Sequence, residues 1–120
     1  EPWLSLEAQK ARKTKLGMDE PKVAAFVEET EFLSLGCYCG IGRALQCLGL
    51  KNRTYPFDWT RAPLFGVVHC LENRFEDFLS FTNTCKFQGV SHTVYTTARW
   101  GGSFWHHSPE AKDTLEQFSR

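Results

Sequence analysis

The chain of 120 residues lacks the features that identify several large classes of protein. No apolar run approaches the roughly 20 residues that a membrane-spanning helix needs, so the sequence predicts no membrane span. Its 14 basic and 14 acidic residues cancel, which argues against nucleic acid or an anionic membrane surface as a partner. Internal repeats and low-complexity tracts are also absent. After these classes are excluded, the sequence is that of an ordinary globular protein.

Cysteine is present without the pattern of a disulfide framework. The five cysteines are an odd number and have no regular spacing, so we expect reduced thiols and favour an intracellular, cytoplasmic compartment. The chain begins with Glu1 and ends inside a helix-like pattern over 111–120, so we expect a fragment of a longer protein, truncated at its C-terminus.

Length and aromatic content predict one domain with a substantial core. Most of the ten Phe, four Trp and three Tyr residues follow position 55, which places the core in the second half. We expect residues 1–30 to form a helical extension and residues 31–120 to form the domain. Because strand-like and helix-like segments alternate, the predicted fold class is α+β, with α/β as the other possibility.

Hydrophobic periodicity and turn residues predict the local structure. Helices are expected over 4–16, over one or two turns at 23–27, over 41–48 with Gly49 as the stop, over 60–75, and from Pro109 onward. Extended segments are expected over 31–35, 54–59, 92–97 and 103–107. We predict a loop over 82–90 and a flexible break at Gly101 and Gly102.

The sequence indicates a chemical role most clearly for Cys39. This residue lies where an expected strand has ended and a helix is about to begin, close to unpaired amides and the positive end of the helix dipole. A thiol there has a lowered pKa and can act as a nucleophile. Cys39 is therefore a better candidate than Cys37. The competing interpretation makes both cysteines small, buried, apolar residues at a tight turn.

A nucleophilic cysteine needs a base, and His106 and His107 follow Cys39 by 67 and 68 residues. Neighbouring side chains of an extended segment point to opposite faces, so only one of the two can face Cys39. Together with Cys37 these residues could also be zinc ligands, but their spacing is poor for zinc. We expect no metal and no cofactor.

Asp58 is the most conspicuous carboxylate, because it stands between Phe57 and Trp59. If it is buried it needs a partner. The slightly favoured interpretation is that Asp58 caps the helix expected from Thr60. The other is that it orients the catalytic histidine or binds substrate.

Two motifs in this order are similar to a known family: Ser34-Leu35-Gly36-x-x-Cys39, and then Tyr55-Pro56-Phe57-Asp58-Trp59. Over about residues 31–110 the chain resembles a family of unknown function described as "putative papain-like cysteine peptidases". The segments 75–79 and 104–107 are also similar to it. The resemblance implies a small papain-like domain with its nucleophile at the start of a helix.

The resemblance also implies roles for individual residues. It puts the nucleophile on Cys39. The family's histidine is commonly followed by aspartate, a pattern that best fits His107, although Ser108 stands in the aspartate's place and His106 stays open. A papain-like site would use a later Asn or Asp to orient the histidine. Asp113 is the one candidate left, but it falls on an expected helix, so the alternative is that the orienting residue is missing from this fragment.

We therefore predict a hydrolase or acyl transferase in which Cys39 attacks a carbonyl and His107, or else His106, acts as base. Amides near Cys39 and Gly40 would stabilise the oxyanion. The substrate would be a peptide or a small amide or ester. The alternative is a non-catalytic interaction domain with an aromatic binding surface. The oligomeric state is left open.

Overall fold

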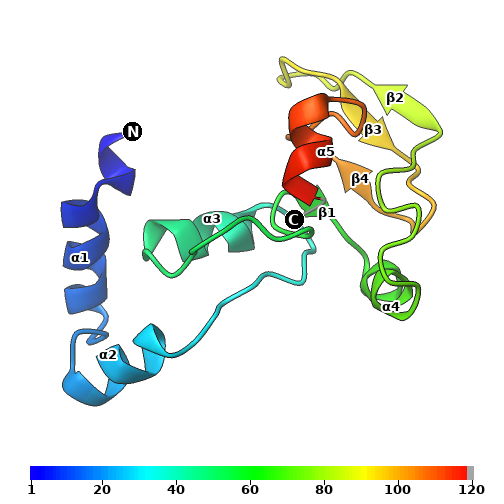
Figure 1. The fold of residues 1–120 in the computed structure, drawn as a ribbon. Helices are drawn as coiled ribbons and strands as arrows, with labels where there is room; N and C mark the ends of the chain where they lie inside the picture. The colour runs from blue at the N-terminus through cyan, green and yellow to red at the C-terminus, as the bar shows by residue number, and fades with distance from the viewer. Residues whose placement is uncertain (119–120) are drawn as a thin grey trace.

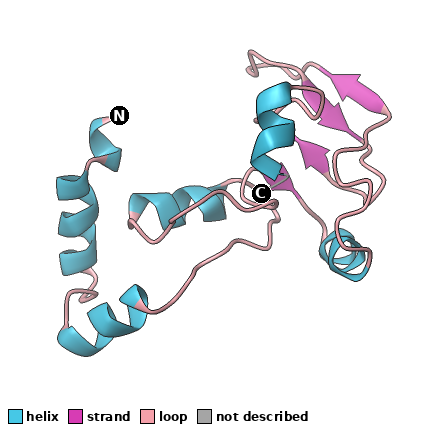
Figure 2. Ribbon diagram, in the orientation of Figure 1, coloured by secondary structure: helices cyan, strands magenta, loops and turns pink. Residues whose placement is uncertain are grey.

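The computed structural model describes residues 1–118, which contain five α-helices and a four-stranded antiparallel sheet. The fold is α+β, as predicted (Figures 1 and 2). In chain order the elements are η1 (Pro2–Leu4), α1 (Leu6–Lys15), α2 (Pro21–Glu28), α3 (Gly40–Cys47), β1 (Thr60–Arg61), α4 (Leu64–Glu72), β2 (Asn83–Cys85), β3 (Val94–Thr96), β4 (Ser103–Phe104) and α5 (Lys112–Phe118).

The N-terminal helices lie apart from the sheet, with α3 between them (Figure 1). Neither η1 nor α1 nor α2 contains a buried residue. Polar contacts join this region to the end of α3: Arg12 donates to the carbonyl oxygen of Cys47 at 2.9 Å and Gln9 to that of Gln46 at 3.3 Å. Helices at both predicted places are confirmed.

The strand predicted over 31–35 is wrong. The segment belongs to no strand of the sheet, although Ser34 and Gly36 are buried while Leu33 and Leu35 are exposed. Its alternating burial therefore reflects packing of one side against the domain. Gly36 has a φ of 96° and turns the chain, and the amide of Cys37 then donates to the carbonyl oxygen of Ala62 at 3.2 Å.

The sheet has the strand order β1-β4-β3-β2. Thr60 and Arg61 pair with β4, so the helix predicted from Thr60 begins only at Leu64, after Pro63. The extended segment predicted over 54–59 is instead a turn, in which the amide of Asp58 donates to the carbonyl oxygen of Tyr55 at 3.1 Å. Asp58 therefore does not cap a helix.

Two further expectations near the C-terminal end need correction. The segment 82–90 is not all loop, because β2 forms there and pairs with β3. The last helix begins at Lys112 rather than at Pro109, since the amides of Glu110 and Ala111 bond to Ser108 in a turn.

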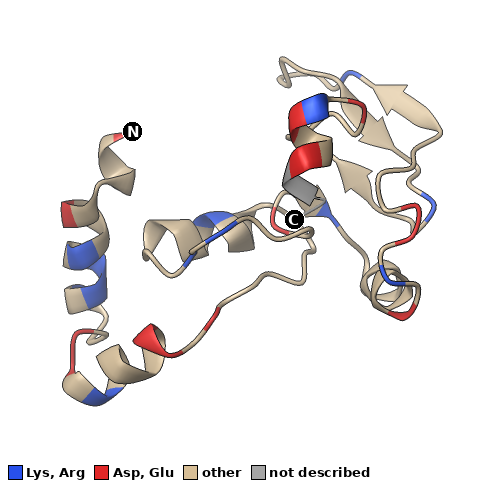
Figure 3. Cartoon of the chain, viewed as in Figure 1, with Lys and Arg blue, Asp and Glu red and all other residues tan. Residues whose placement is uncertain are grey.

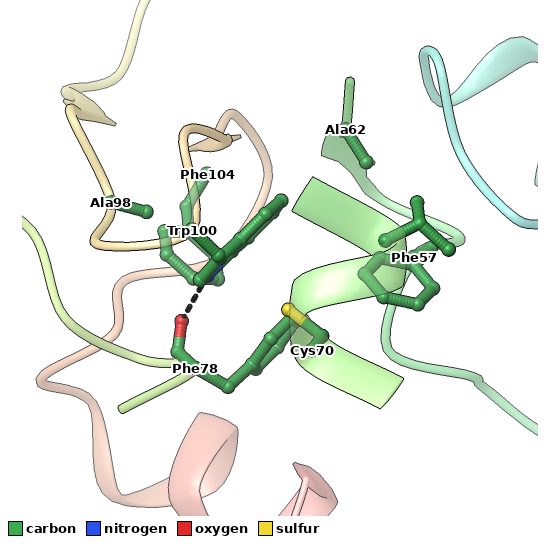
Figure 4. Close-up of a cluster of buried hydrophobic side chains, with 8 residues drawn as sticks. Phe57, Ala62, Cys70, Phe78, Ala98, Trp100 and Phe104 are labelled. Atoms are coloured by element: carbon green, nitrogen blue, oxygen red, sulfur yellow. Dashed lines mark hydrogen bonds between the residues drawn. The ribbon is translucent and has the colours of Figure 1, made fainter. Parts of the chain in front are cut away.

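The core lies in the second half, as predicted, and is largely aromatic (Figure 4). The indole of Trp100 donates to the carbonyl oxygen of Phe78 at 2.7 Å, and the two rings stack with centroids 5.2 Å apart. Gly102 is not a simple flexible break: a Cβ there would lie 1.9 Å from the Trp100 ring, so this glycine permits close packing. The buried residues are Phe57, Ala62, Val67, Cys70, Phe78, Ala98, Trp100 and Phe104.

Helix α4 packs on the core through a narrow face. Gly66, Val67 and Cys70 face the core, while Leu64 and Phe65 are 77% and 69% exposed. A Cβ at Gly66 would lie 2.4 Å from the carbonyl oxygen of Trp100, so close approach at this glycine sets the face that α4 turns inward. Among the helices of residues 1–118, none has the length and hydropathy to span a bilayer.

Candidate active site

Cys39 lies at the start of helix α3, as the sequence predicted. It is the N-cap residue, and its carbonyl oxygen accepts a hydrogen bond from the amide of Arg43 at 3.0 Å. The amides that follow Cys39 in the first turn have no acceptor within the helix, and with the helix dipole they favour negative charge there. Cys39 is half-buried and Cys37 is exposed. The interpretation of both as buried apolar residues is therefore wrong.

Two glycines allow the cysteine loop and α3 to lie directly against residues 58–62. A Cβ at Gly36 would come within 2.6 Å of the Ala62 Cβ, and one at Gly42 would come within 2.9 Å of the Asp58 carbonyl oxygen. The bond from the Cys37 amide to the Ala62 carbonyl oxygen, at 3.2 Å, holds the same contact. Cys39 is thus fixed beside β1.

Strand β4 brings the histidines to β1. Thr60 pairs with Phe104, so the residues that precede β1 and those that follow β4 continue side by side. The ring of Trp59 meets the ring of His106 edge-on, with centroids 5.7 Å apart. His92 contacts the carbonyl oxygen of Trp105 through Nε2, and its ring centroid lies 6.1 Å from that of His106.

Cys39 and His106 line the same small cavity. Its volume is about 60 Å³, and its other walls come from the segment around β1 and from the end of β4. Three parts of the sequence, the cysteine loop, the β1 segment and the residues after β4, therefore meet at one point. The remaining lining residues are Tyr38, Trp59, Thr60, Arg61 and Trp105.

Both imidazoles are poorer proton acceptors than free histidine. Burial lowers the pKa of His106, and the charges of His92 and Arg43 lower it further. Burial likewise lowers the pKa of His107, with smaller effects from His106 and Lys51. His106 stays neutral at neutral pH, so its free ring nitrogen can accept a proton. His107 is half-buried, lies within the influence of Lys51 and does not line the Cys39 cavity.

Asp58 is fully buried and ion-paired. Its Oδ2 lies 2.7 Å from Nζ of Lys51 and accepts a hydrogen bond from the amide of Tyr55 at 2.8 Å. Its Oδ1 has no hydrogen-bond partner in the described part of the chain. The carboxylate does not line the Cys39 cavity, although the neighbouring Trp59 does. Asp113 lies exposed on α5.

Among the other cysteines, Cys70 is buried in the core. Burial raises the pKa of the Cys70 thiol to about 11, which keeps it protonated. Within residues 1–118, no three His, Cys, Asp or Glu side chains are grouped so as to bind a metal ion.

Sequence reasoning missed the residues that enclose the site. Trp59 and Trp105 adjoin the predicted Asp58 and His106, so their positions could have been noticed. Arg61 and Lys51 stand in no motif, and only the pairing of β1 with β4 and the Asp58 ion pair reveal their roles.

The motifs that contain the site residues lie within a match to a known family. Residues 30–108 match the family described as "Putative papain-like cysteine peptidase (DUF1796)", and the chain belongs to it. Among individual proteins, the chain is 38% identical over 74 residues to "Uncharacterized protein R408" of Acanthamoeba polyphaga mimivirus, a match that covers 60% of this chain and 33% of that protein. The match thus spans about a third of the relative's length. No solved structure has a significant match to the chain.

Proposed function

We propose that this chain carries the nucleophile and the base of a cysteine hydrolase, with Cys39 as nucleophile and His106 as base. The observation that supports this most directly is the cavity of about 60 Å³ that both residues line. The family description supports the same reaction class. His107, which the motif comparison favoured, is the alternative base.

The proposed reaction is acyl transfer through a thioester. His106 takes the proton of the Cys39 thiol, and the thiolate attacks the carbonyl carbon of a peptide, amide or ester. Amides in the first turn of α3 stabilise the oxyanion. Protonated His106 then gives its proton to the leaving group. Water, deprotonated by His106, hydrolyses the thioester and restores the thiol.

Asp58 acts as a positioning residue in this scheme rather than as a catalytic one. Its ion pair with Lys51, at 2.7 Å, and its bond to the Tyr55 amide fix the turn that ends at Trp59. Nζ of Lys51 also lies 5.3 Å from the Trp59 ring centroid. Trp59 in turn contacts His106, so the buried pair acts on the base through this tryptophan.

Alkylation tests the proposal without a known substrate. Iodoacetamide at about pH 6.5 should modify Cys39 faster than the other four thiols, because only Cys39 has both a helix N-terminus and a base. Mass spectrometry of the digested protein measures each site. His106→Gln should slow alkylation of Cys39 roughly tenfold, which is less than the loss of a general base in a full catalytic cycle, because the helix N-terminus still favours the thiolate.

His107→Gln is the matched control. It alters the neighbouring imidazole, which does not line the cavity, so the Cys39 rate should change little. If alkylation of Cys39 is slow in His107→Gln and normal in His106→Gln, His107 is the base and His106 is not. Equal labelling of all five thiols would contradict the enzyme proposal. The interaction-domain alternative would then remain, with the exposed Leu64 and Phe65 of α4 as its natural surface.

A further inference from the structure

The walls of the Cys39 cavity carry positive charge that no acidic side chain balances. Arg61 lines the cavity, and Arg43 lies one turn along α3 from Cys39, close enough for its charge to act on His106. Within residues 1–118 neither arginine has a salt bridge, although both are exposed. Figure 3 shows basic positions on α3 and β1. Asp58, which precedes the cavity residue Trp59, is already paired with Lys51.

Arg61 is held in place by aromatic stacking. Its guanidinium carbon lies 4.0 Å from the centroid of the Trp105 ring, and that ring stacks on Phe87 with centroids 4.9 Å apart. The pairing of Arg61 with Ser103 fixes its backbone. A guanidinium stacked on an aromatic face keeps its N–H donors at the edge, free for an anion. Arg61 is therefore an ordered, available donor.

The cavity is small. Its volume of about 60 Å³ leaves room for a group of the size of a carboxylate. Thr60, which also lines it, is 2% exposed, and its hydroxyl has no hydrogen-bond partner among residues 1–118. This hydroxyl is sealed from the cavity, so recognition of a ligand there rests on Arg61.

We propose that the Cys39 cavity recognises a carboxylate next to the carbonyl that Cys39 attacks. Arg61 binds it by charge-assisted hydrogen bonds, and Arg43 adds a second positive charge. The substrates are then acidic peptides or amides, whose carboxylate is either a side chain or a free main-chain terminus. This inference rests on the proposed function, because it names the substrate class of the same site.

A pair of alkylating agents that differ in charge tests the inference. Iodoacetate carries a carboxylate where iodoacetamide carries a neutral amide of nearly the same shape. We expect the ratio of the iodoacetate rate to the iodoacetamide rate to be higher at Cys39 than at the exposed Cys37. Arg61→Gln should lower the Cys39 ratio about three- to fivefold, a typical effect for a partly exposed ion pair. Added NaCl should lower it too.

Arg99→Gln is the matched control. It removes the same charge from an arginine that pairs with Asp77 and does not line the cavity, so the ratio at Cys39 should stay unchanged. Far-ultraviolet circular dichroism of both variants checks that they fold. An equal ratio at Cys39 and Cys37, unaffected by Arg61→Gln, would overturn the inference. The proposed function would survive that result, because its test is the rate with the neutral reagent and its dependence on His106.

Protection experiments identify the source of the carboxylate. N-acetylglutamate α-amide offers a side-chain carboxylate, N-acetylglycine offers a terminal one, and N-acetylglutamine α-amide offers neither. Protection of Cys39 from iodoacetamide by either acid, lost in Arg61→Gln, supports the proposal, and the better protector names the source. Protection by neither acid, or equal protection by the neutral amide, contradicts it.

Discussion

The N-terminal helices and the aromatic core are stabilised by different kinds of contact. None of the residues of η1, α1 and α2 is buried, and this region meets α3 mainly through polar contacts. The region from Phe57 to Phe104 buries eight residues in one cluster. Since apolar burial is the dominant favourable term in folding, the core region determines whether the domain folds.

The candidate site lies at the end of α3 that faces the core region, and α3 separates it from the N-terminal helices. His106 follows β4 and belongs to the core region, while Cys39 begins α3, whose far end contacts Gln9 and Arg12 of α1. Stability and site geometry should therefore be separable. Changes in the core should affect both, changes at the contact between α3 and the β1 segment should affect geometry most, and changes at exposed positions of α1 such as Leu6 should affect neither.

The largest effect is expected in the core, at Trp100. Trp100→Ala removes a ring that is 2% exposed and stacked on Phe78, and it should lower the free energy of unfolding by about 3–5 kcal/mol. Urea denaturation followed by circular dichroism measures the loss. Trp100→Phe keeps a ring but loses the donor to the Phe78 carbonyl oxygen, so it should cost less. Equal losses would mean that packing contributes little.

The next effect is expected at the buried ion pair. Lys51→Met leaves Asp58 without its counter-ion in a fully buried position, which should cost about 3 kcal/mol of unfolding free energy. Lys51→Met combined with Asp58→Asn should lose less than the single variant, because the unpaired charge is gone. A double-mutant cycle gives the coupling. Additive losses in that cycle would contradict the assigned pair.

Gly42 tests the contact between α3 and the β1 segment. Gly42→Ala places a methyl group 2.9 Å from the Asp58 carbonyl oxygen, where backbone must move, and it should cost about 1–3 kcal/mol. It should also slow alkylation of Cys39. Gly40→Ala is the control for stability alone: its methyl would meet the ring of Tyr38, which is 54% exposed and can rotate away. Because Tyr38 lines the Cys39 cavity, the alkylation rate of this variant is not a control. A neutral Gly42→Ala would contradict the close approach.

The elements that depend on local signals could be predicted from the sequence. The i, i+3, i+4 spacing and Gly49 predicted α3, and Gly49 indeed has the left-handed φ of 63° that ends a helix. Segment 31–35 was wrong because its alternating pattern is also produced by packing one side of an unpaired chain. Residues 60–61 were assigned to a helix because their pairing with β4 depends on residues more than forty positions away.

The residues proposed for the site could be chosen from the sequence, but their arrangement could not. Cys39 and the histidines follow from residue type and local position. Which histidine faces the thiol depends on how the chain continues after β4, and no local pattern encodes that. The role of Asp58 was misjudged for the same kind of reason: its partner, Lys51, lies in a loop that the sequence marks only as a connection.

A smaller effect on stability is expected from pH, and it should come from His106 and His107, which follow β4 in the core region. Burial lowers the pKa of both imidazoles, so the folded chain binds fewer protons than the unfolded chain. Stability should therefore fall as the pH drops below about 6.5, the ordinary histidine value. Solvent screening keeps the loss below about 1 kcal/mol. Urea midpoints at about pH 7.5 and pH 5.5 measure it, and His106→Gln/His107→Gln should flatten the dependence.

The smallest effect is expected in α1, where Leu6 is 83% exposed. Leu6→Ser should change the free energy of unfolding by less than about 0.5 kcal/mol, because the leucine buries little surface in the folded chain. The alkylation rate of Cys39 should also stay the same. Val94→Ser is the matched change at a fully buried position of β3, and it should be far more destabilising. A large loss of unfolding free energy in Leu6→Ser would show that the N-terminal helices also depend on apolar contacts. The two regions would then differ less than their burial suggests.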